Sequence, residues 1–212
     1  TADLLNGDEN TAGFLTSGGT ESILCGVLAA RKRGLAERNI TEPEMVLSES
    51  AHAAFHKAAD NFGLTVHKAP VRDDYTANVE AMASMVNDNT VLVVGSAPQY
   101  PQGVQDDIPS IAALAKSVGA NCYVDACMGG FVLPFAAMEQ PQAWSAPPWD
   151  LAVEGVTSIS ADLHKLGYAP KGVSVLLHRS RALRRHQTFD FDGWLGGRYV
   201  TPNLQGTRSG LP

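Results

Sequence analysis

Residues Ser160–Lys165 (SADLHK) follow directly on Val156–Ile159 (VTSI), a short, largely β-branched run that is typical of a strand. Tyr123–Asp125 (YVD) closes a second strand-like run earlier in the chain. In open α/β sheets, the carboxyl ends of parallel strands form the edge at which ligands bind. A lysine and an aspartate placed at the ends of two such runs therefore predict an α/β fold with a ligand site at that edge.

Strand-like and helix-like segments alternate along the chain, as expected for a mostly parallel sheet flanked by helices. We expect helices over residues 20–37, 53–61, 78–86 and 107–118, and strands over residues 45–48, 64–67, 90–95, 121–125, 156–160 and 173–178. The last strand follows the preceding one after a short turn, so we expect it to pair antiparallel at that end of the sheet. Residues 136–150 are rich in Pro, Ala, Gln and Trp and are expected to form an excursion between strands.

The composition is that of an ordinary globular protein. The 212 residues, 44% of them hydrophobic, suffice for one domain with a single core. The formal net charge of −6 argues against nucleic acid or an anionic membrane face as a partner. No apolar run approaches the ~20 residues of a membrane span, so no membrane contact is expected of residues 1–212, and a membrane tether ahead of them stays open.

The cysteines and histidines predict neither disulfides nor a metal site. Cys25, Cys122 and Cys127 are odd in number and lack zinc-type spacing, so we expect free thiols and a cytoplasmic location. His52 and His56 are four residues apart, but no HExxH pattern and no third ligand accompany them.

Three segments carry groups that fit one small cofactor. Gly18, Gly19 and Thr20 precede a predicted helix, whose first N–H groups and dipole can receive a phosphate. The Asp125 carboxylate can hold a proton on a pyridine nitrogen, and Lys165 can form a Schiff base with an aldehyde. A phosphate site, a pyridine partner and a Schiff-base lysine are the anchors of pyridoxal 5'-phosphate, which is therefore the predicted cofactor.

Other side chains are expected around this cofactor. Lys165 must be neutral to act as a nucleophile, so we expect burial or nearby cations such as His164 and Lys171 to lower its pKa. His52 follows a predicted strand at the same sheet edge, where its imidazole can stack on the pyridine ring. Cys127 can line the opposite face of that ring.

Six segments, in order and over nearly the whole chain, resemble the sphingosine-1-phosphate lyase branch of the group II pyridoxal-phosphate decarboxylase family. They are TSGGTESIL (16–24), SAHAAFHKAA (50–59), GSAPQYPQGVQDDI (95–108), YVDACMGGF (123–131), GVTSISADLHKLGYAPKG (155–172) and TPNLQGTRSG (201–210). The chain departs from the family at Leu163 and Leu166, where its lyases usually have Thr and Tyr. It also has Gln205–Ser209 in place of Ala-Gly-Ser-Arg-Pro, and we expect these changes to affect the substrate more than the cofactor.

The resemblance implies a fold-type I, aminotransferase-like architecture and assigns roles to the anchor residues. It makes Lys165 the Schiff-base lysine and Asp125 the partner of the pyridine nitrogen. It makes His52 the ring-stacking residue, and Gly19 and Thr20 part of the phosphate cup.

Further roles implied by the resemblance extend to the substrate and to a second subunit. His164 is similar to a neighbour of the phosphate, and Tyr168 and Lys171 are similar to residues near the substrate phosphate or the path of the transferred proton. Gly206 and Thr207 resemble a loop that reaches the cofactor phosphate of the neighbouring subunit, which implies a homodimer with shared active sites. Lys165, Tyr168 and His164 are the candidate proton carriers, and the sequence does not rank them.

The leading hypothesis is a carbon–carbon lyase that cleaves a phosphorylated, sphingoid-type amino alcohol to a long-chain aldehyde and phosphoethanolamine. An alternative is an α-decarboxylase of glutamate, aspartate or an aromatic amino acid, in which Arg208 could bind the substrate carboxylate. A second alternative is a cofactor- or partner-binding domain without catalysis, against which the intact Lys165 and Asp125 argue. We expect residues 1–212 to be the cofactor-binding large domain of a longer protein, with an N-terminal segment and a small C-terminal domain outside it.

Overall fold

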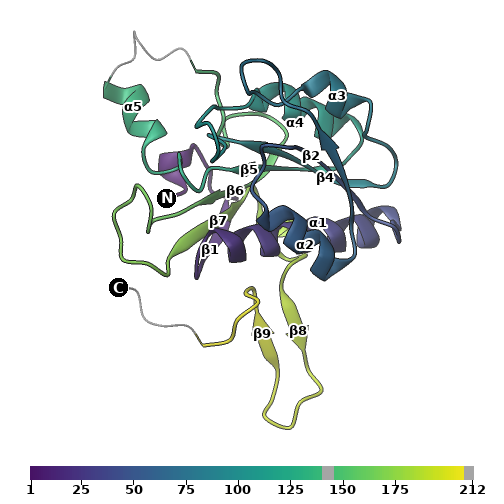
Figure 1. Cartoon of the computed structure of the whole chain (residues 1–212). Helices are drawn as coiled ribbons and strands as arrows, with labels where there is room; N and C mark the ends of the chain where they lie inside the picture. The colour runs from purple at the N-terminus through teal and green to yellow at the C-terminus, as the bar shows by residue number, and fades with distance from the viewer. Residues whose placement is uncertain (140–145, 208–212) are drawn as a thin grey trace.

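A seven-stranded mixed sheet with helices on both faces forms the body of the protein in a computed structural model, which describes residues 1–139 and 146–207 (Figure 1). The strand order is β1-β7-β6-β5-β4-β2-β3. These strands are β1 (Ala12–Thr16), β2 (Glu44–Ser48), β3 (Thr65–Ala69), β4 (Thr90–Ser96), β5 (Asn121–Asp125), β6 (Val156–Ala161) and β7 (Ser174–His178).

Helices α1 and α2 cover one face of the sheet, and α3 and α4 cover the other (Figure 1). The helices are η1, a 3-10 turn (Asp3–Leu5), α1 (Gly19–Arg38), α2 (Ala54–Phe62), α3 (Val79–Ala83), α4 (Ile108–Ser117), α5 (Leu133–Glu139) and α6 (Arg181–Arg184). Strands β2, β3, β4, β5 and β6 are parallel neighbours, which confirms the predicted α/β architecture with a mostly parallel sheet.

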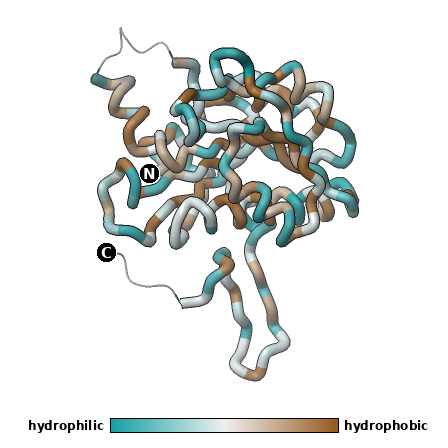
Figure 2. The backbone as a smooth tube through the Cα atoms, in the orientation of Figure 1, coloured by the Kyte–Doolittle hydropathy of each residue, from teal (hydrophilic) through white to brown (hydrophobic). Residues whose placement is uncertain are grey.

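The central strands are buried on both faces. Every residue of β4 and of β5 is buried, as expected for parallel strands between two helical layers. Two hydrophobic clusters result, one between the sheet and α4 and one between the sheet and α1 with α2. In Figure 2, hydrophobic residues are concentrated in the sheet and in the helices that cover it, and hydrophilic residues are common in the surrounding loops.

The antiparallel pairing of the last predicted strand is confirmed, but its place in the sheet differs. β7 pairs antiparallel with β6, and the unpredicted β1 pairs antiparallel with β7 and forms the edge. Gly13 weakens the strand signal of β1, because glycine is disfavoured in strand interiors. The structure nevertheless requires a glycine at position 13, since a Cβ there would lie 2.5 Å from Leu177. β1 therefore runs in the direction of β6, and its carboxyl end reaches the predicted ligand edge.

Other segments also differ from the expectation. The helix predicted over residues 78–86 is only the short α3, Val79–Ala83. An unpredicted hairpin of β8 (Phe189–Phe191) and β9 (Tyr199–Thr201) extends away from the sheet (Figure 1). The start of the predicted excursion over residues 136–150 belongs to α5, and residues 140–145 lie outside the described residues.

Helix α1 lies directly on β5 because Gly26 faces the strand. A Cβ at Gly26 would be 2.2 Å from Cε2 of Tyr123, a buried residue of β5. Glycine inside a helix costs roughly 0.5–1 kcal/mol relative to alanine. Here it permits the close approach that brings the start of α1 near Asp125.

Candidate active site

Four strand ends meet around one cavity. Because β1, β2, β5 and β6 run in the same direction, the segments that follow them lie at one edge of the sheet. The cavity there has a volume of about 340 Å³, within the usual range for a small-molecule site. It is lined by Ser17, Gly18, Gly19, Thr20, Glu21, Ile23, His52, Pro98, Tyr100, Asp125, Cys127, Met128, Asp162, His164 and Lys165.

The glycine segment forms a cradle without side chains at the start of α1. Gly18 has φ 155° and ψ 170°, a conformation that is essentially restricted to glycine. A Cβ at Gly18 would be 3.2 Å from His164 Cε1, and a Cβ at Gly19 would be 2.7 Å from Cys127 Sγ. The first-turn N–H groups of a helix have no acceptor within the helix. This cradle can therefore bind an anion such as a phosphate, as predicted for Gly18, Gly19 and Thr20.

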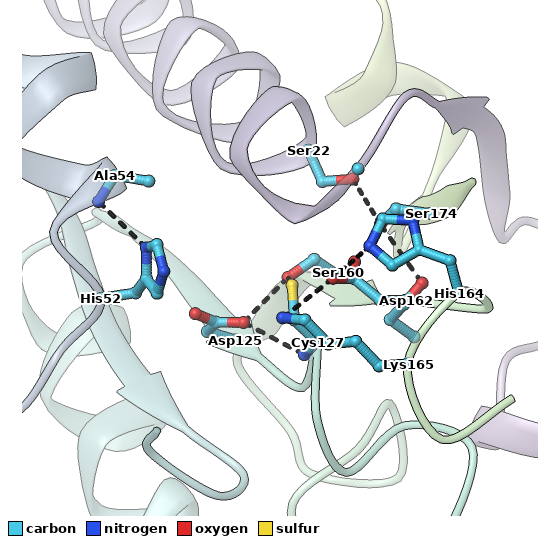
Figure 3. Close-up of polar contacts among 12 residues, drawn as sticks. Ser22, His52, Ala54, Asp125, Cys127, Ser160, Asp162, His164, Lys165 and Ser174 are labelled. Atoms are coloured by element: carbon cyan, nitrogen blue, oxygen red, sulfur yellow. Dashed lines mark hydrogen bonds and ion pairs between the residues drawn. The ribbon is translucent and has the colours of Figure 1, made fainter. Parts of the chain in front are cut away.

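Asp125 is fixed at the end of β5 and is only 8% exposed. Its Oδ1 accepts hydrogen bonds from the Cys127 N–H (3.1 Å) and the Ser160 hydroxyl (3.3 Å). The second oxygen has no hydrogen bond to any described residue, so it is free for a ligand. Figure 3 shows His52 on one side of Asp125, and Lys165 with Asp162 on the other.

Lys165 is held by an acid instead of being surrounded by cations. Its Nζ lies 2.9 Å from Asp162 Oδ2, which makes the contact an ion pair. Burial lowers the pKa of Lys165, but its interactions with Cys127, Asp162 and Asp125 outweigh burial and leave that pKa raised. The expected lowering of the pKa is therefore wrong for this structure. Lys171 does not line the cavity either.

Asp162 is a site residue that the sequence analysis missed. It is 1% exposed and lies in the cavity wall between Lys165 and His164, whose Nε2 is 3.4 Å from Asp162 Oδ2. The sequence contained a signal for it, because two residues three positions apart in a tight turn, such as Asp162 and Lys165, have side chains on the same side of the turn. Tyr100 and Met128, which also line the cavity, were missed as well.

The two cavity histidines are both oriented by backbone N–H groups. His52 Nδ1 accepts from the Ala54 N–H at 3.1 Å, which fixes the ring just before α2. His164 Nδ1 accepts from the N–H groups of Gly172 and Val173 at 3.1 and 3.0 Å. Nδ1 therefore carries no proton in either ring, and the hydrogen is on Nε2. His164 thus presents an N–H donor to the cradle and to Asp162.

Cys127 forms part of the cavity wall, as predicted. Its thiol donates to Ser160 Oγ at 3.2 Å. Burial raises the pKa of Cys127 well above its ordinary value, and Asp125 and Asp162 raise it further. At neutral pH the side chain is therefore a neutral, packed thiol.

Several predicted residues do not line this cavity. Tyr168 is 89% exposed, Lys171 is exposed, and both belong to the loop between β6 and β7. Gly206 and Thr207 are also exposed, although the neighbouring Gln205 reaches the cradle by donating to Ser17 Oγ at 3.1 Å. Arg208 lies outside the described residues.

The cavity suits pyridoxal phosphate. Gly19 leaves no room for a Cβ, Asp125 has an oxygen without a hydrogen bond to any described residue, and Lys165 lines the same cavity. The fold and the site together define a pyridoxal-phosphate-binding α/β protein of fold-type I. No helix within residues 1–139 and 146–207 combines the length and apolarity that crossing a bilayer requires.

The chain belongs to the pyridoxal-dependent decarboxylase family, because the model of that family's conserved domain matches residues 2–195. Sphingosine-1-phosphate lyase of Arabidopsis thaliana is 44% identical over 99% of the chain, and sphingosine-1-phosphate lyase 1 of Rattus norvegicus is 45% identical over 99%. The chain spans only 39% and 36% of the length of these relatives.

Solved structures show the same relationship. The sphingosine-1-phosphate lyase of Burkholderia pseudomallei superposes with a TM-score of 0.94 and 43% identity, covering 99% of this chain and 49% of that one. Glutamate decarboxylase of Lactobacillus brevis superposes with a TM-score of 0.78 and 26% identity, covering 96% of this chain and 48% of that one.

Proposed function

We propose that the protein containing this chain is a pyridoxal-phosphate-dependent carbon–carbon lyase. Its substrate would be a phosphorylated, sphingoid-type amino alcohol, and its products a long-chain aldehyde and phosphoethanolamine. The observation that carries this proposal is the 43% identity and TM-score of 0.94 to a sphingosine-1-phosphate lyase, compared with 26% and 0.78 for a glutamate decarboxylase.

The cavity residues have distinct roles in this proposal. Pyridoxal phosphate, when bound, supplies a pyridine ring that accepts the electron pair of the broken bond. The Gly19 and Thr20 N–H groups would bind the phosphate, together with His164 Nε2–H. Asp125 would hold a proton on the ring nitrogen, and His52 would pack against the face of the ring.

Proton transfer is assigned to Lys165 in this proposal. Its Nζ lies in the cavity, whereas the Tyr168 hydroxyl lies on an exposed loop outside it. His164 Nδ1 already accepts two backbone N–H groups, so that nitrogen is not free to accept a substrate proton. Tyr168, Lys171 and Arg208 stay predicted contacts of the substrate.

The proposal extends to the organisation of the whole protein. Residues 1–212 would be the cofactor-binding large domain of a homodimer, in which Gly206 and Thr207 reach the cofactor phosphate of the partner subunit. Both residues are exposed, which leaves them available for such a contact. The three cysteines are all free and buried, which supports a cytoplasmic location.

The test uses the full-length protein and a sphingoid base phosphate. We expect equal amounts of aldehyde and phosphoethanolamine by mass spectrometry, and loss of both products in Lys165→Ala. Lys116→Ala removes an exposed lysine that pairs with Glu154 on the surface and should leave the rate unchanged. Carbon dioxide release from glutamate, aspartate or an aromatic amino acid, without aldehyde formation, would instead establish the decarboxylase alternative.

A further inference from the structure

Asp162 joins two cavity residues through one buried carboxylate. Its Oδ2 is 2.9 Å from Lys165 Nζ and 3.4 Å from His164 Nε2, and its side chain is 1% exposed. Its Oδ1 has no hydrogen-bond partner among the described residues. The acid also borders the phosphate cradle, because a Cβ at Gly19 would lie 2.9 Å from Oδ2. These contacts place one buried carboxylate next to both Lys165 and His164 (Figure 3).

Within residues 1–139 and 146–207, four ionisable groups face Lys165, and only one of them is a close anion. Cys127 is a neutral thiol at neutral pH because burial raises its pKa. His164 presents an N–H, and Asp125 Oδ1 is already engaged by the Cys127 N–H and the Ser160 hydroxyl. Asp162 is therefore the counter-ion of the Lys165 ammonium. Burial alone favours the neutral amine, and this counter-ion at 2.9 Å opposes that effect.

We propose that Asp162 is a positioning residue that holds Lys165 as a fixed ammonium in the cofactor-free site. The inference deepens the proposed function and rests on its assignment of Lys165 as the lysine that binds the cofactor. An ammonium cannot attack an aldehyde. Asp162 thus sets the pH at which the empty site can capture its cofactor, while keeping the amine aimed into the cavity.

The geometry explains why this control is reversible. Lys165 and Asp162 are joined by an ion pair at 2.9 Å and by no covalent bond, so the amine can leave the carboxylate. His164 stays in place when the lysine moves, because the Gly172 and Val173 N–H groups hold its Nδ1 from the other side.

Competitive acetylation of the full-length, cofactor-free protein tests the proposal. Trace acetic anhydride is applied over a pH series, and peptide mass spectrometry reads Lys165, with exposed Lys171 as the internal reference. We expect the pH at the midpoint of Lys165 labelling to be higher than the corresponding pH for Lys171 in the wild type. In Asp162→Asn, it should fall below that of Lys171. At a pH below the midpoint, lowering the midpoint by one pH unit gives about tenfold more labelling of Lys165.

Two further variants separate charge from structure. Asp162→Glu keeps the negative charge and should keep a high midpoint, whereas Asp73→Asn makes the same change at an exposed acid and should change nothing. An unchanged Lys165 midpoint in folded Asp162→Asn would overturn the proposal. If that variant does not fold, a wild-type midpoint at or below that of Lys171 would overturn it. No substrate is used, so failure of the lyase assay is a separate result.

Discussion

At the scale of single residues, the shape of the cavity depends on glycines, which have no side chain, as much as on the side chains that line it. Gly19 lies between the Cys127 thiol and the Asp162 carboxylate, with no room for a methyl group. The backbone at this point can therefore approach a phosphate, which is the physical reason for a glycine at the start of α1.

Gly19→Ala tests that reason. The new methyl group would lie 2.7 Å from Cys127 Sγ and 2.9 Å from Asp162 Oδ2, so the cradle must shift. We expect at least about tenfold weaker binding of pyridoxal phosphate, or about 1.4 kcal/mol, in an absorbance titration.

Gly63→Ala is the matched control for this substitution. Gly63 ends α2 with φ 66° and no atom within 4 Å of an added Cβ. The alanine should cost about 1 kcal/mol of unfolding free energy through backbone strain, but leave cofactor binding intact. Wild-type cofactor affinity in Gly19→Ala would show that the phosphate binds elsewhere.

At the scale of elements, buried polar contacts hold the strand ends in place. The Ser22 hydroxyl of α1 lies 2.7 Å from Thr16 Oγ1 of β1 and 3.0 Å from Ser174 Oγ of β7. This chain of hydroxyls fixes the start of α1 over the two strands (Figure 3). Asp106 does the same for β4, because its carboxylate accepts the Ser96 and Ala77 N–H groups at 2.8 and 2.9 Å.

Asp106 should make stability depend on pH. Burial raises its pKa to about 6 in spite of the two N–H donors, so the folded protein binds a proton more tightly than the unfolded chain, in which the pKa is near 3.8. Its stabilising contribution is therefore complete below about pH 4 and is lost as the pH rises to about 6. The loss amounts to about 3 kcal/mol.

Denaturant unfolding of wild type and Asp106→Asn across this window measures the effect. The difference in unfolding free energy between the two proteins should fall from pH 4 to pH 6 and then stay level. Asp60→Asn, at an exposed acid on α2, should show no such slope. A difference that rises with pH would mean that the two N–H donors outweigh burial.

At the scale of the whole molecule, the hairpin of β8 and β9 exposes apolar side chains away from the sheet. Trp194 is 60% exposed, Leu195 is fully exposed, and Val200 lies beside them on β9. In the homodimer proposed above, this surface and the following segment with Thr207 would contact the partner subunit.

Trp194→Glu in the full-length protein tests this arrangement. A charge on an apolar contact should shift the dimer toward monomer in sedimentation velocity and weaken cofactor binding, because the partner's loop is lost. Asp192→Ala changes a polar residue of the same hairpin and should leave the dimer intact. A Trp194→Glu protein that stays dimeric with full cofactor affinity would exclude the hairpin as the contact.

The local pattern of residues was enough to locate most of the sheet and to bring the three predicted cofactor residues to one cavity. Strand runs such as Thr90–Ser96, with their helical connections, identify a parallel sheet, and parallel strands bring their carboxyl ends to one edge. Lys165, Asp125 and Gly19 could therefore be placed in one site without coordinates, as the cavity lining agrees.

Only the tertiary structure decided how these groups act on each other. The edge position of β1 and the close contact of Gly26 with Tyr123 join residues whose local sequence carries little sign of the partner. The charge of Lys165 follows from the opposing effects of burial and of acids from two strand ends. Such a balance depends on distances through space, which spacing along the chain does not specify.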